Sequence, residues 1–159
     1  MTPTPVSLKG RALRLLSQRD HTRAELERKL AALEEEPGEL ARVLDELERK
    51  GFIQEGRVVE SHLNRRAARL GASRLRQELL NKGVSPEAVQ DALRTLGGTE
   101  EERARAVWAR KFGQAPATAN DRARHMRFLM SRGFSAAIVQ RVLQSAQQAA
   151  KADTHPQGD

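Results

Sequence analysis

One turn of this chain occurs twice, 50 residues apart. It reads Leu79-Leu80-Asn81-Lys82-Gly83-Val84-Ser85 in the middle of the chain and Leu129-Met130-Ser131-Arg132-Gly133-Phe134-Ser135 towards its end. Each copy is typical of a helix that stops at a left-handed glycine, after which an apolar residue folds back and a serine caps the next helix. Two copies at a fixed spacing predict a structural repeat built from helices.

The leucine pattern extends this repeat towards the N-terminus. A shift of 49 residues aligns five leucines of the first unit with apolar residues of the second: Leu26, Leu30, Leu40, Leu44 and Leu47 fall on Leu75, Leu79, Val89, Leu93 and Leu96. The alternative is that amphipathic helices align on their leucines without being repeats, and only the second and third units also share the glycine turn. We predict helical repeats over residues 1–52, 53–98 and 99–150, and a disordered tail over 151–159.

Cap signals predict about nine helices in an all-α fold. Thr22-Arg23-Ala24-Glu25 is a capping box, and helix starts are also expected at Ser85-Pro86-Glu87 and Thr99-Glu100-Glu101-Glu102. The second helix is expected to carry Leu33 on the same face as Leu26 and Leu30, and the fifth to carry Leu80 on its apolar side. The chain has no tyrosine, and isoleucine and valine are scarce beside alanine and leucine, so β-sheet is disfavoured.

The composition argues against an enzyme. None of the 159 residues is cysteine, which excludes disulfides, thiolate nucleophiles and zinc–cysteine sites. None of the four histidines has a second histidine one helical turn away, and no glycine-rich phosphate loop follows a strand. We therefore expect no catalytic residues, no cofactor and no metal; an acid–base site assembled across helices is the enzyme alternative that stays open. Because the chain has neither a signal peptide nor a long apolar run, we expect a cytoplasmic protein that does not enter membranes.

The net charge of +7 is distributed unevenly. Residues 1–52 have 10 basic and 10 acidic side chains (net 0), residues 53–98 have 8 and 5 (+3), and residues 99–159 have 10 and 6 (+4). Most of the cations in the last two repeats are arginines, which bind carboxylates and phosphates through two parallel hydrogen bonds. They recur at comparable positions, as expected of a surface that follows an extended anionic partner. The candidates for a binding face are Arg65, Arg66, Arg69, Arg74, Arg76, Lys82, Arg124, Arg127 and Arg132.

Composition leaves more than one kind of partner open. Proteins that bind single-stranded nucleic acid usually present aromatic side chains to the bases. The five aromatic residues here occupy apolar helical positions or turns, so we interpret them mainly as core: Phe52, Trp108, Phe112, Phe128 and Phe134. Phosphate contacts, a protein partner or both remain open. Three-helix units with glycine turns also suit a helix-turn-helix DNA-binding protein, although three in tandem do not give the half-site spacing of a dimeric repressor.

Several motifs along the chain resemble the RecX family, the regulators of the bacterial RecA recombinase. The most specific are Gln77-Glu78-Leu79-Leu80-Asn81-Lys82-Gly83-Val84 in the second repeat and Arg127-Phe128-Leu129-Met130-Ser131-Arg132-Gly133-Phe134 in the third. The first repeat contributes Arg23-Ala24-Glu25-Leu26-Glu27-Arg28-Lys29-Leu30, and the resemblance covers roughly residues 8–145. The chain departs from the family at Ile53-Gln54-Glu55-Gly56-Arg57-Val58-Val59, where aromatic residues and paired aspartates are common.

The resemblance implies an elongated, curved array of three tandem three-helix repeats. It also implies a non-enzymatic regulator that binds RecA and its DNA filament. Such a regulator inhibits ATP hydrolysis, strand exchange and filament growth, and so modulates recombination, DNA repair and the SOS response. The implied partners are the RecA filament and DNA, mainly single-stranded and within that filament. We expect a monomer, because no heptad seam or large unclaimed apolar stripe is present. The alternative is a stand-alone, helix-turn-helix-like nucleic-acid-binding protein.

Overall fold

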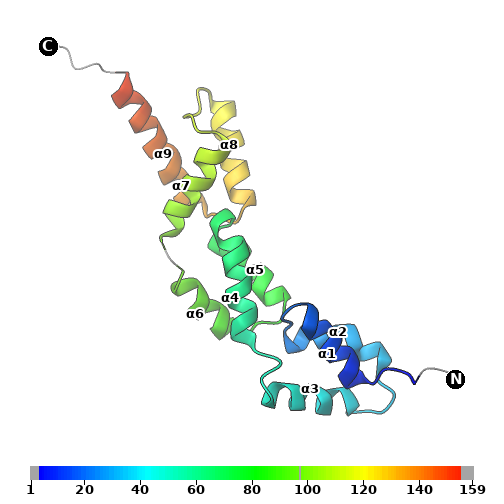
Figure 1. Ribbon diagram of the computed structural model, residues 1–159. Helices are drawn as coiled ribbons and strands as arrows, with labels where there is room; N and C mark the ends of the chain where they lie inside the picture. The colour runs from blue at the N-terminus through cyan, green and yellow to red at the C-terminus, as the bar shows by residue number, and fades with distance from the viewer. Residues whose placement is uncertain (1–3, 97, 155–159) are drawn as a thin grey trace. The chain divides into compact units, whose positions relative to one another are not determined.

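The computed structural model describes residues 4–96 and 98–154. Over these residues the fold is all-α, as predicted, with nine α-helices, two short 3₁₀-helices and no strand (Figure 1). The elements are α1 (Leu8–Gln18), α2 (Arg23–Leu30), η1 (Ala31–Leu33), α3 (Glu39–Arg49), α4 (Glu55–Arg66), η2 (Ala67–Arg69), α5 (Ala72–Asn81), α6 (Pro86–Arg94), α7 (Glu100–Lys111), α8 (Ala119–Ser131) and α9 (Ala136–Asp153).

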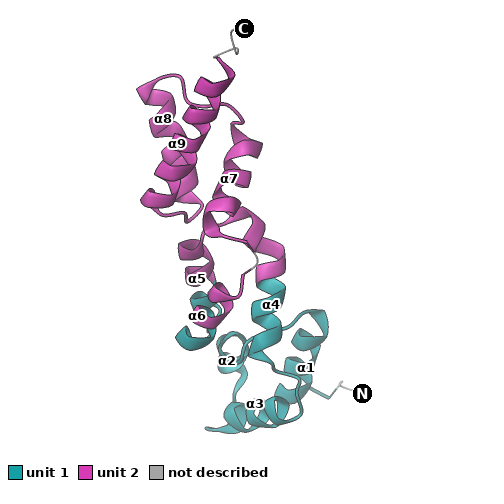
Figure 2. Cartoon of the chain, turned by 90° about the vertical axis from the view of Figure 1, so that its left-hand side faces the viewer, with its two compact units in different colours: residues 1–62, 79–89 teal, residues 63–78, 90–159 magenta. Residues whose placement is uncertain are grey.

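The described chain divides into two compact units (Figure 2). Unit 1 holds residues up to 62 together with 79–89, and unit 2 holds residues 63–78 together with those from 90 onward. Helices α4, α5 and α6 each contribute residues to both units. The second predicted repeat therefore has no compact unit of its own.

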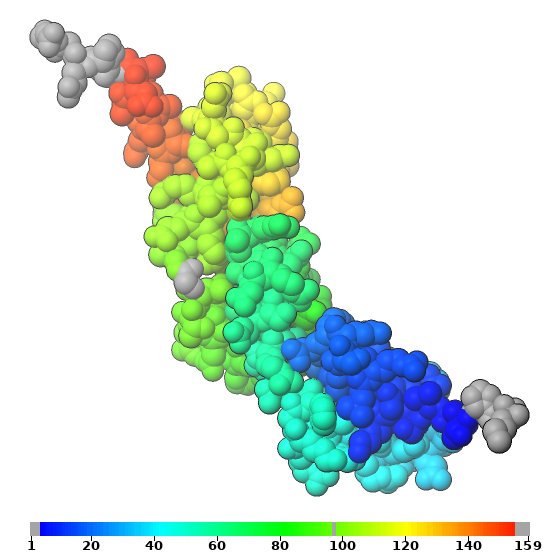
Figure 3. Space-filling view, in the orientation of Figure 1, coloured from blue at the N-terminus to red at the C-terminus, as the bar shows by residue number. Residues whose placement is uncertain are grey.

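Unit 1 is built on a core shared by α1, α2 and α3. Its buried residues are Leu8, Ala12, Leu26, Leu30, Leu40, Leu44, Leu47 and Ile53. Figure 3 shows the side chains of the first two helices, in blue, against those of α3, in cyan. The predicted capping box is formed: the Thr22 hydroxyl accepts from the Glu25 backbone N–H, and the Glu25 carboxylate accepts from the Thr22 N–H.

Three apolar residues of the predicted faces and core are exposed instead. Leu33 is 43% exposed because α2 ends at Leu30, so the α-helical register that aligned the two no longer applies. Leu80 is 41% exposed because it follows the fully buried Leu79, and successive helical residues point about 100° apart. Phe52 is 46% exposed because it lies in the turn after α3, where the next residue, Ile53, is the one that packs into the core.

Unit 2 has its core between α7, α8 and α9. Its buried residues are Ala104, Val107, Trp108, Leu129, Phe134, Val139, Val142 and Leu143. Phe112 and Phe128 are half-buried and pack against this cluster, so four of the five aromatic residues are in or against the core, and Phe52 is the exception. Helix α9 continues to Asp153, into the predicted tail, and residues 155–159 lie outside the described residues.

The repeated turn makes the same kind of contact in each unit. In unit 1, Gly83 has a φ of +89° and lies so close to the start of α2 that a β-carbon there would overlap Cβ of Ala24. In unit 2, Gly133 has a φ of +91°, and a β-carbon there would overlap Cβ of Arg74, near the start of α5. Ala24 and Arg74 are themselves 50 residues apart, as are the two glycines.

Arginine side chains fasten both copies of this turn. In unit 1, Arg28 Nη2 donates to the carbonyl of Asn81 at 2.9 Å, and in unit 2, Arg74 Nη1 donates to the carbonyl of Ser131 at 3.1 Å. The two carbonyls are again 50 residues apart. We call this arrangement, the Gly83 or Gly133 turn packed on a helix start of the preceding repeat, the repeat joint. Its two copies give structural support to the repeat in the sequence.

Candidate anion-binding site

Four cations of unit 2 line one pocket, which we call the basic pocket. Its lining consists of Arg69, Val107, Arg110, Lys111, Phe128 and Arg132, and its volume is about 410 Å³. Arg69 comes from η2, Val107, Arg110 and Lys111 from α7, Phe128 from α8, and Arg132 from the turn that follows α8. Among the described residues no carboxylate lines the pocket, so the charged side chains of its wall are all positive.

The ring of Phe128 forms the apolar part of the basic pocket. Lys111 Nζ lies over it at 5.4 Å from the ring centroid, and Arg132 Cζ lies over it at 5.0 Å. Phe112 meets the same ring edge-on, with 5.6 Å between the centroids. Cations are attracted to the negative face of an aromatic ring, so Phe128 holds two of the four charges in place without neutralising them.

The backbone of η2 positions the pocket against α7. Arg110 Nη2 donates to the carbonyl of Ala68 at 3.1 Å, which ties the last turn of α7 to the segment that carries Arg69. The backbone N–H of Gly71 donates to the carbonyl of Arg132 at 2.8 Å, so the same segment also reaches the turn after α8. The repeat joint of unit 2 thus brings Arg69 and Arg132, which are far apart in the sequence, to one pocket.

Within the described residues, the four cations of the basic pocket form no ion pair with a carboxylate. Other arginines of unit 2 do: Arg105 and Arg141 both pair with Glu101, at 3.4 and 3.8 Å. The pocket therefore gathers positive charge that no carboxylate of the described residues pairs with.

Some of the predicted binding residues already form ion pairs or hydrogen bonds within the protein. Arg66 binds Glu78 through two hydrogen bonds, of 2.5 and 3.3 Å, and the bond to Glu78 raises the pKa of the guanidinium. Arg74 donates to the Ser131 carbonyl and lies 3.9 Å from Glu78. Arg124 is 3.6 Å from Asp121 and lies over the ring of Phe112. These three side chains have structural partners within unit 2.

The remaining predicted residues are placed as follows. Arg69 and Arg132 line the basic pocket, Arg65, Arg76 and Arg127 are exposed on α4, α5 and α8, and Lys82 is half-buried in unit 1. The backbone carbonyl of Lys82 accepts a hydrogen bond from the Thr22 hydroxyl. The positive charge of the Lys82 side chain acts on the Glu25 carboxylate. Of the nine predicted residues, Arg69 and Arg132 are the two that line the basic pocket.

Two residues of the basic pocket, Arg110 and Lys111, were not among the predicted binding residues. The sequence did contain a signal for them, because residues 107, 110 and 111 follow the i, i+3, i+4 spacing of one helix face. That spacing aligns Val107 with the two cations, and so marks a basic edge beside the apolar face of α7.

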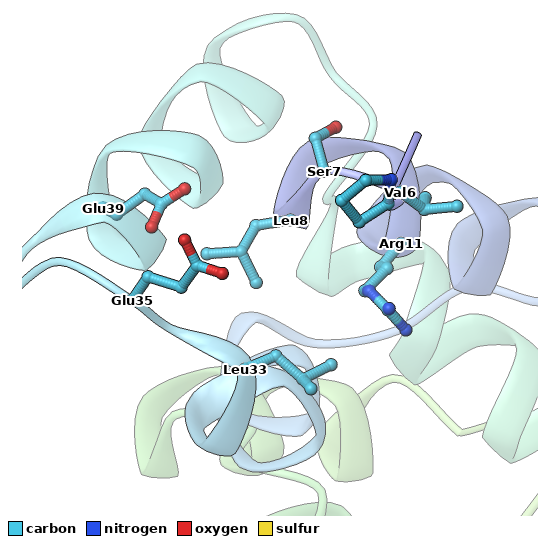
Figure 4. A pocket seen from close by; sticks show the side chains of 8 residues that line it. Val6, Ser7, Leu8, Arg11, Leu33, Glu35 and Glu39 are labelled. Atoms are coloured by element: carbon cyan, nitrogen blue, oxygen red, sulfur yellow. The ribbon is translucent and has the colours of Figure 1, made fainter. Parts of the chain in front are cut away.

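Unit 1 has a pocket of the opposite character. Its volume is about 230 Å³, and it is lined by Pro5, Val6, Ser7, Leu8, Arg11, Leu33, Glu35 and Glu39. Figure 4 shows the carboxylates of Glu35 and Glu39 on one side of Leu8 and the Arg11 guanidinium on the other. Carboxylates repel anions, so this pocket is not a second copy of the basic pocket.

No cluster of three or more histidine, aspartate or glutamate side chains suited to a metal ion occurs in the described part of the chain. Over the same residues, no helix is both long and apolar enough to cross a bilayer.

Comparison with known proteins identifies the family. The family models for the first, second and third three-helix domains of RecX match residues 9–47, 55–93 and 99–143. Regulatory protein RecX of Leptothrix cholodnii is 54% identical over 141 residues, which cover 89% of this chain and 90% of that protein. Regulatory protein RecX of Herminiimonas arsenicoxydans is 45% identical over 148 residues, which cover 93% and 98%. The chain belongs to the RecX family.

A solved RecX structure shares the fold. The crystal structure of RecX from Lactobacillus salivarius aligns with a TM-score of 0.73 at 21% identity, over 89% of this chain and 95% of that one. The three RecX domains correspond to the helix triplets α1–α3, α4–α6 and α7–α9. The basic pocket draws Arg69 from the second RecX domain and its other residues from the third.

Proposed function

We propose that this RecX-family protein regulates the RecA recombinase by binding RecA and the RecA–DNA filament, and that it inhibits ATP hydrolysis, strand exchange and filament growth. The proposal is supported chiefly by the three RecX domains, which follow in family order over residues 9–143. On this proposal the protein acts as a cytoplasmic monomer of three repeats (1–52, 53–98 and 99–150), without catalytic residues or a cofactor of its own.

To inhibit in this way, the protein needs only to occupy its binding site on the filament; it does not need to catalyse a reaction. A filament of protein on DNA offers both carboxylates and phosphates, and arginine can bind either through two parallel N–H donors. Cations that lack an internal carboxylate partner can make such contacts without first breaking an ion pair. Over the part of the chain that the structure describes, such cations of unit 2 include Arg76 and Arg127 on the surface and the four cations of the basic pocket.

The direct test is to titrate the protein into RecA that is hydrolysing ATP on single-stranded DNA. We expect hydrolysis to fall. Inhibition well below one molecule per RecA would indicate capping of the growing filament end, and a need for nearly equal amounts would indicate occupancy along the filament.

A surface variant tests the binding face in the same assay. Arg76→Ala with Arg127→Ala should weaken inhibition several-fold and leave the helical content unchanged, because both side chains are exposed. The matched control is Arg105→Ala with Arg141→Ala. It also removes two positive charges, but from arginines that are paired with Glu101. Equal inhibition by all three proteins would contradict this binding face.

Binding to naked DNA is measured in the same buffer. If ATP hydrolysis does not fall while the protein binds DNA tightly without RecA, the stand-alone nucleic-acid-binding alternative replaces the RecA proposal.

A further inference from the structure

We propose that the basic pocket binds successive phosphates of a nucleic-acid strand and does so without reading the base sequence. The inference rests on the proposed function for its setting, since DNA would reach the pocket within the RecA filament. Binding of the phosphate itself requires only unit 2, so it can be tested without RecA.

The basic pocket concentrates positive charge. Arg69, Arg110, Lys111 and Arg132 line a volume of about 410 Å³ and have no carboxylate among them. Like charges repel one another more strongly where water is partly displaced by protein. An anion in the pocket relieves this repulsion and gains hydrogen bonds from donors that are already assembled.

The number of cations favours a phosphate strand over an acidic side chain. A carboxylate carries one charge and two oxygens, so it can neutralise one of the four cations. A nucleic-acid backbone carries one charge per nucleotide, and each phosphate exposes two oxygens to donors. The four cations come from η2, α7 and the turn after α8 and line one pocket, so together they offer positive charge to more than one phosphate of a strand.

The aromatic residue of the pocket is not placed for base stacking. Phe128 is packed against the core of unit 2 and meets Phe112 edge-on. Lys111 and Arg132 both lie over its ring. A base that stacked on Phe128 would have to displace these cations, whereas a phosphate would bind them where they stand. We therefore expect contacts to the backbone, which position a strand without specifying its sequence.

The test uses Arg69→Gln with Lys111→Gln in the full chain. Both side chains are exposed and hydrogen-bond to no other described residue, whereas Arg110 is left in place because it donates to the Ala68 carbonyl. The control is Arg105→Gln with Arg141→Gln, which makes the same change in net charge outside the pocket. Thermal melting of both variants verifies that each is folded.

The readout is fluorescence anisotropy of a labelled oligothymidine at several salt concentrations. The pocket variant should bind roughly tenfold more weakly at low salt, since each interaction removed is a charge-assisted hydrogen bond. The slope of log affinity against log salt should fall by about 0.7 for each phosphate that the variant no longer binds. The control should keep nearly the affinity and slope of the unmodified protein. A strand of equal length with abasic sites should bind the unmodified protein as tightly as oligothymidine.

Other results would overturn the assignment. Equal losses in both variants would mean that net charge alone drives binding, and no loss in either would mean that DNA does not use the pocket. If the pocket variant binds DNA normally but no longer inhibits RecA, the pocket receives acidic protein side chains. Much weaker binding of the abasic strand would show that bases are contacted.

Two further arms separate the sources of phosphate and the two proposals. Inorganic tripolyphosphate that binds the pocket as tightly as the strand would identify a free polyphosphate as the ligand and overturn the strand assignment. Conversely, pocket-dependent DNA binding by a protein that does not inhibit RecA would leave the phosphate site standing and remove the proposed function.

Discussion

His125 illustrates how a single residue can tie stability to pH. Its ring is buried, stacks on Phe112 with 3.7 Å between the centroids, and accepts a hydrogen bond at Nδ1 from Trp108 Nε1 at 3.1 Å. An Nδ1 that accepts a hydrogen bond carries no proton, so the neutral ring is the form that fits. Burial, and to a lesser degree the charge of Arg124, lowers the pKa of His125 below its ordinary 6.5.

The pKa of His21 is also lowered. Burial is the largest cause that lowers the pKa of this ring, and its Nε2 lies 3.1 Å from the Lys29 ammonium, which can donate only to an unprotonated nitrogen. Both histidines therefore bind a proton more readily in the unfolded chain than in the folded one.

We predict that the free energy of unfolding is highest above pH 6.5 and falls as the pH drops through 6.5 towards the lowered pKa values. Each histidine can contribute a slope of at most about 1.4 kcal/mol per pH unit. Urea unfolding between pH 7.5 and about 5 measures this. His125→Gln should flatten the slope by up to half, whatever its effect on stability at neutral pH; an unchanged slope would show that His125 is not responsible.

Titration of Glu46 should change the free energy of unfolding only at a lower pH than the histidines do. Hydrogen bonds from Lys50 and Lys9 lower the pKa of Glu46 to about 2. The stability that Glu46 contributes is present above the ordinary value of 4.5 and is lost as the pH falls towards 2. The histidine window can therefore be measured without interference from this group.

Among the secondary-structure elements, local sequence signals predicted where helices start and end better than they predicted which side chains are exposed or lie together. Thr22 and Gly83 act through their own backbone neighbourhood, so a short stretch of sequence was enough to place a helix start and a helix end. The exposure of Leu80 and the association of Arg69 with Arg110 depend on which residues a neighbouring helix brings close. A helical pattern shows which residues share a face, but it does not show what covers that face.

A pair of caps separates local from long-range stabilisation. Thr22 and Thr99 both close a capping box, with Glu25 and Glu102, but only the Thr22 hydroxyl also donates to a distant carbonyl, that of Lys82. Thr99→Ala should cost about 1 kcal/mol through its cap alone. Thr22→Ala should cost about 1 kcal/mol more, because the Lys82 carbonyl also loses its donor. Chemical denaturation measures both, and equal costs would mean that the Thr22–Lys82 bond adds no stability.

The repeat joint can be tested with glycines of equal backbone conformation. Gly38, Gly83 and Gly133 have φ values of +86°, +89° and +91°, so alanine is strained by about 1–2 kcal/mol at each. At Gly38 a β-carbon would meet only the mobile end of Arg42, at 3.7 Å, whereas at Gly83 and Gly133 it would overlap Ala24 and Arg74. Gly83→Ala and Gly133→Ala should therefore lower the melting temperature clearly more than Gly38→Ala. Similar losses at all three positions would show that close approach at the joint is unimportant.

At the scale of the whole molecule, the repeat in the sequence does not map onto equal pieces of core. The two hydrophobic clusters lie within the first and third repeats, apart from Ile53 at the boundary of the first. Buried residues of the second repeat are divided between the units: Val59, Leu79 and Val89 are in unit 1, and Leu70 and Leu75 are in unit 2. The second repeat therefore depends on its neighbours for burial, as in other proteins built of short repeats.

The third repeat contains its own core cluster and the second does not, and this difference predicts how fragments of the chain behave. Residues 99–154 contain the whole core cluster of unit 2, so the fragment should be helical and unfold cooperatively, at a lower temperature than the full chain. Residues 53–98 should show little helix, because a fragment near the lower size limit of about 40 residues has no core without its neighbours. Circular dichroism and thermal melting of the two fragments measure this. A cooperative transition in residues 53–98 would mean that the middle repeat is an independent domain, and that its division between the two units does not reflect how it gains stability.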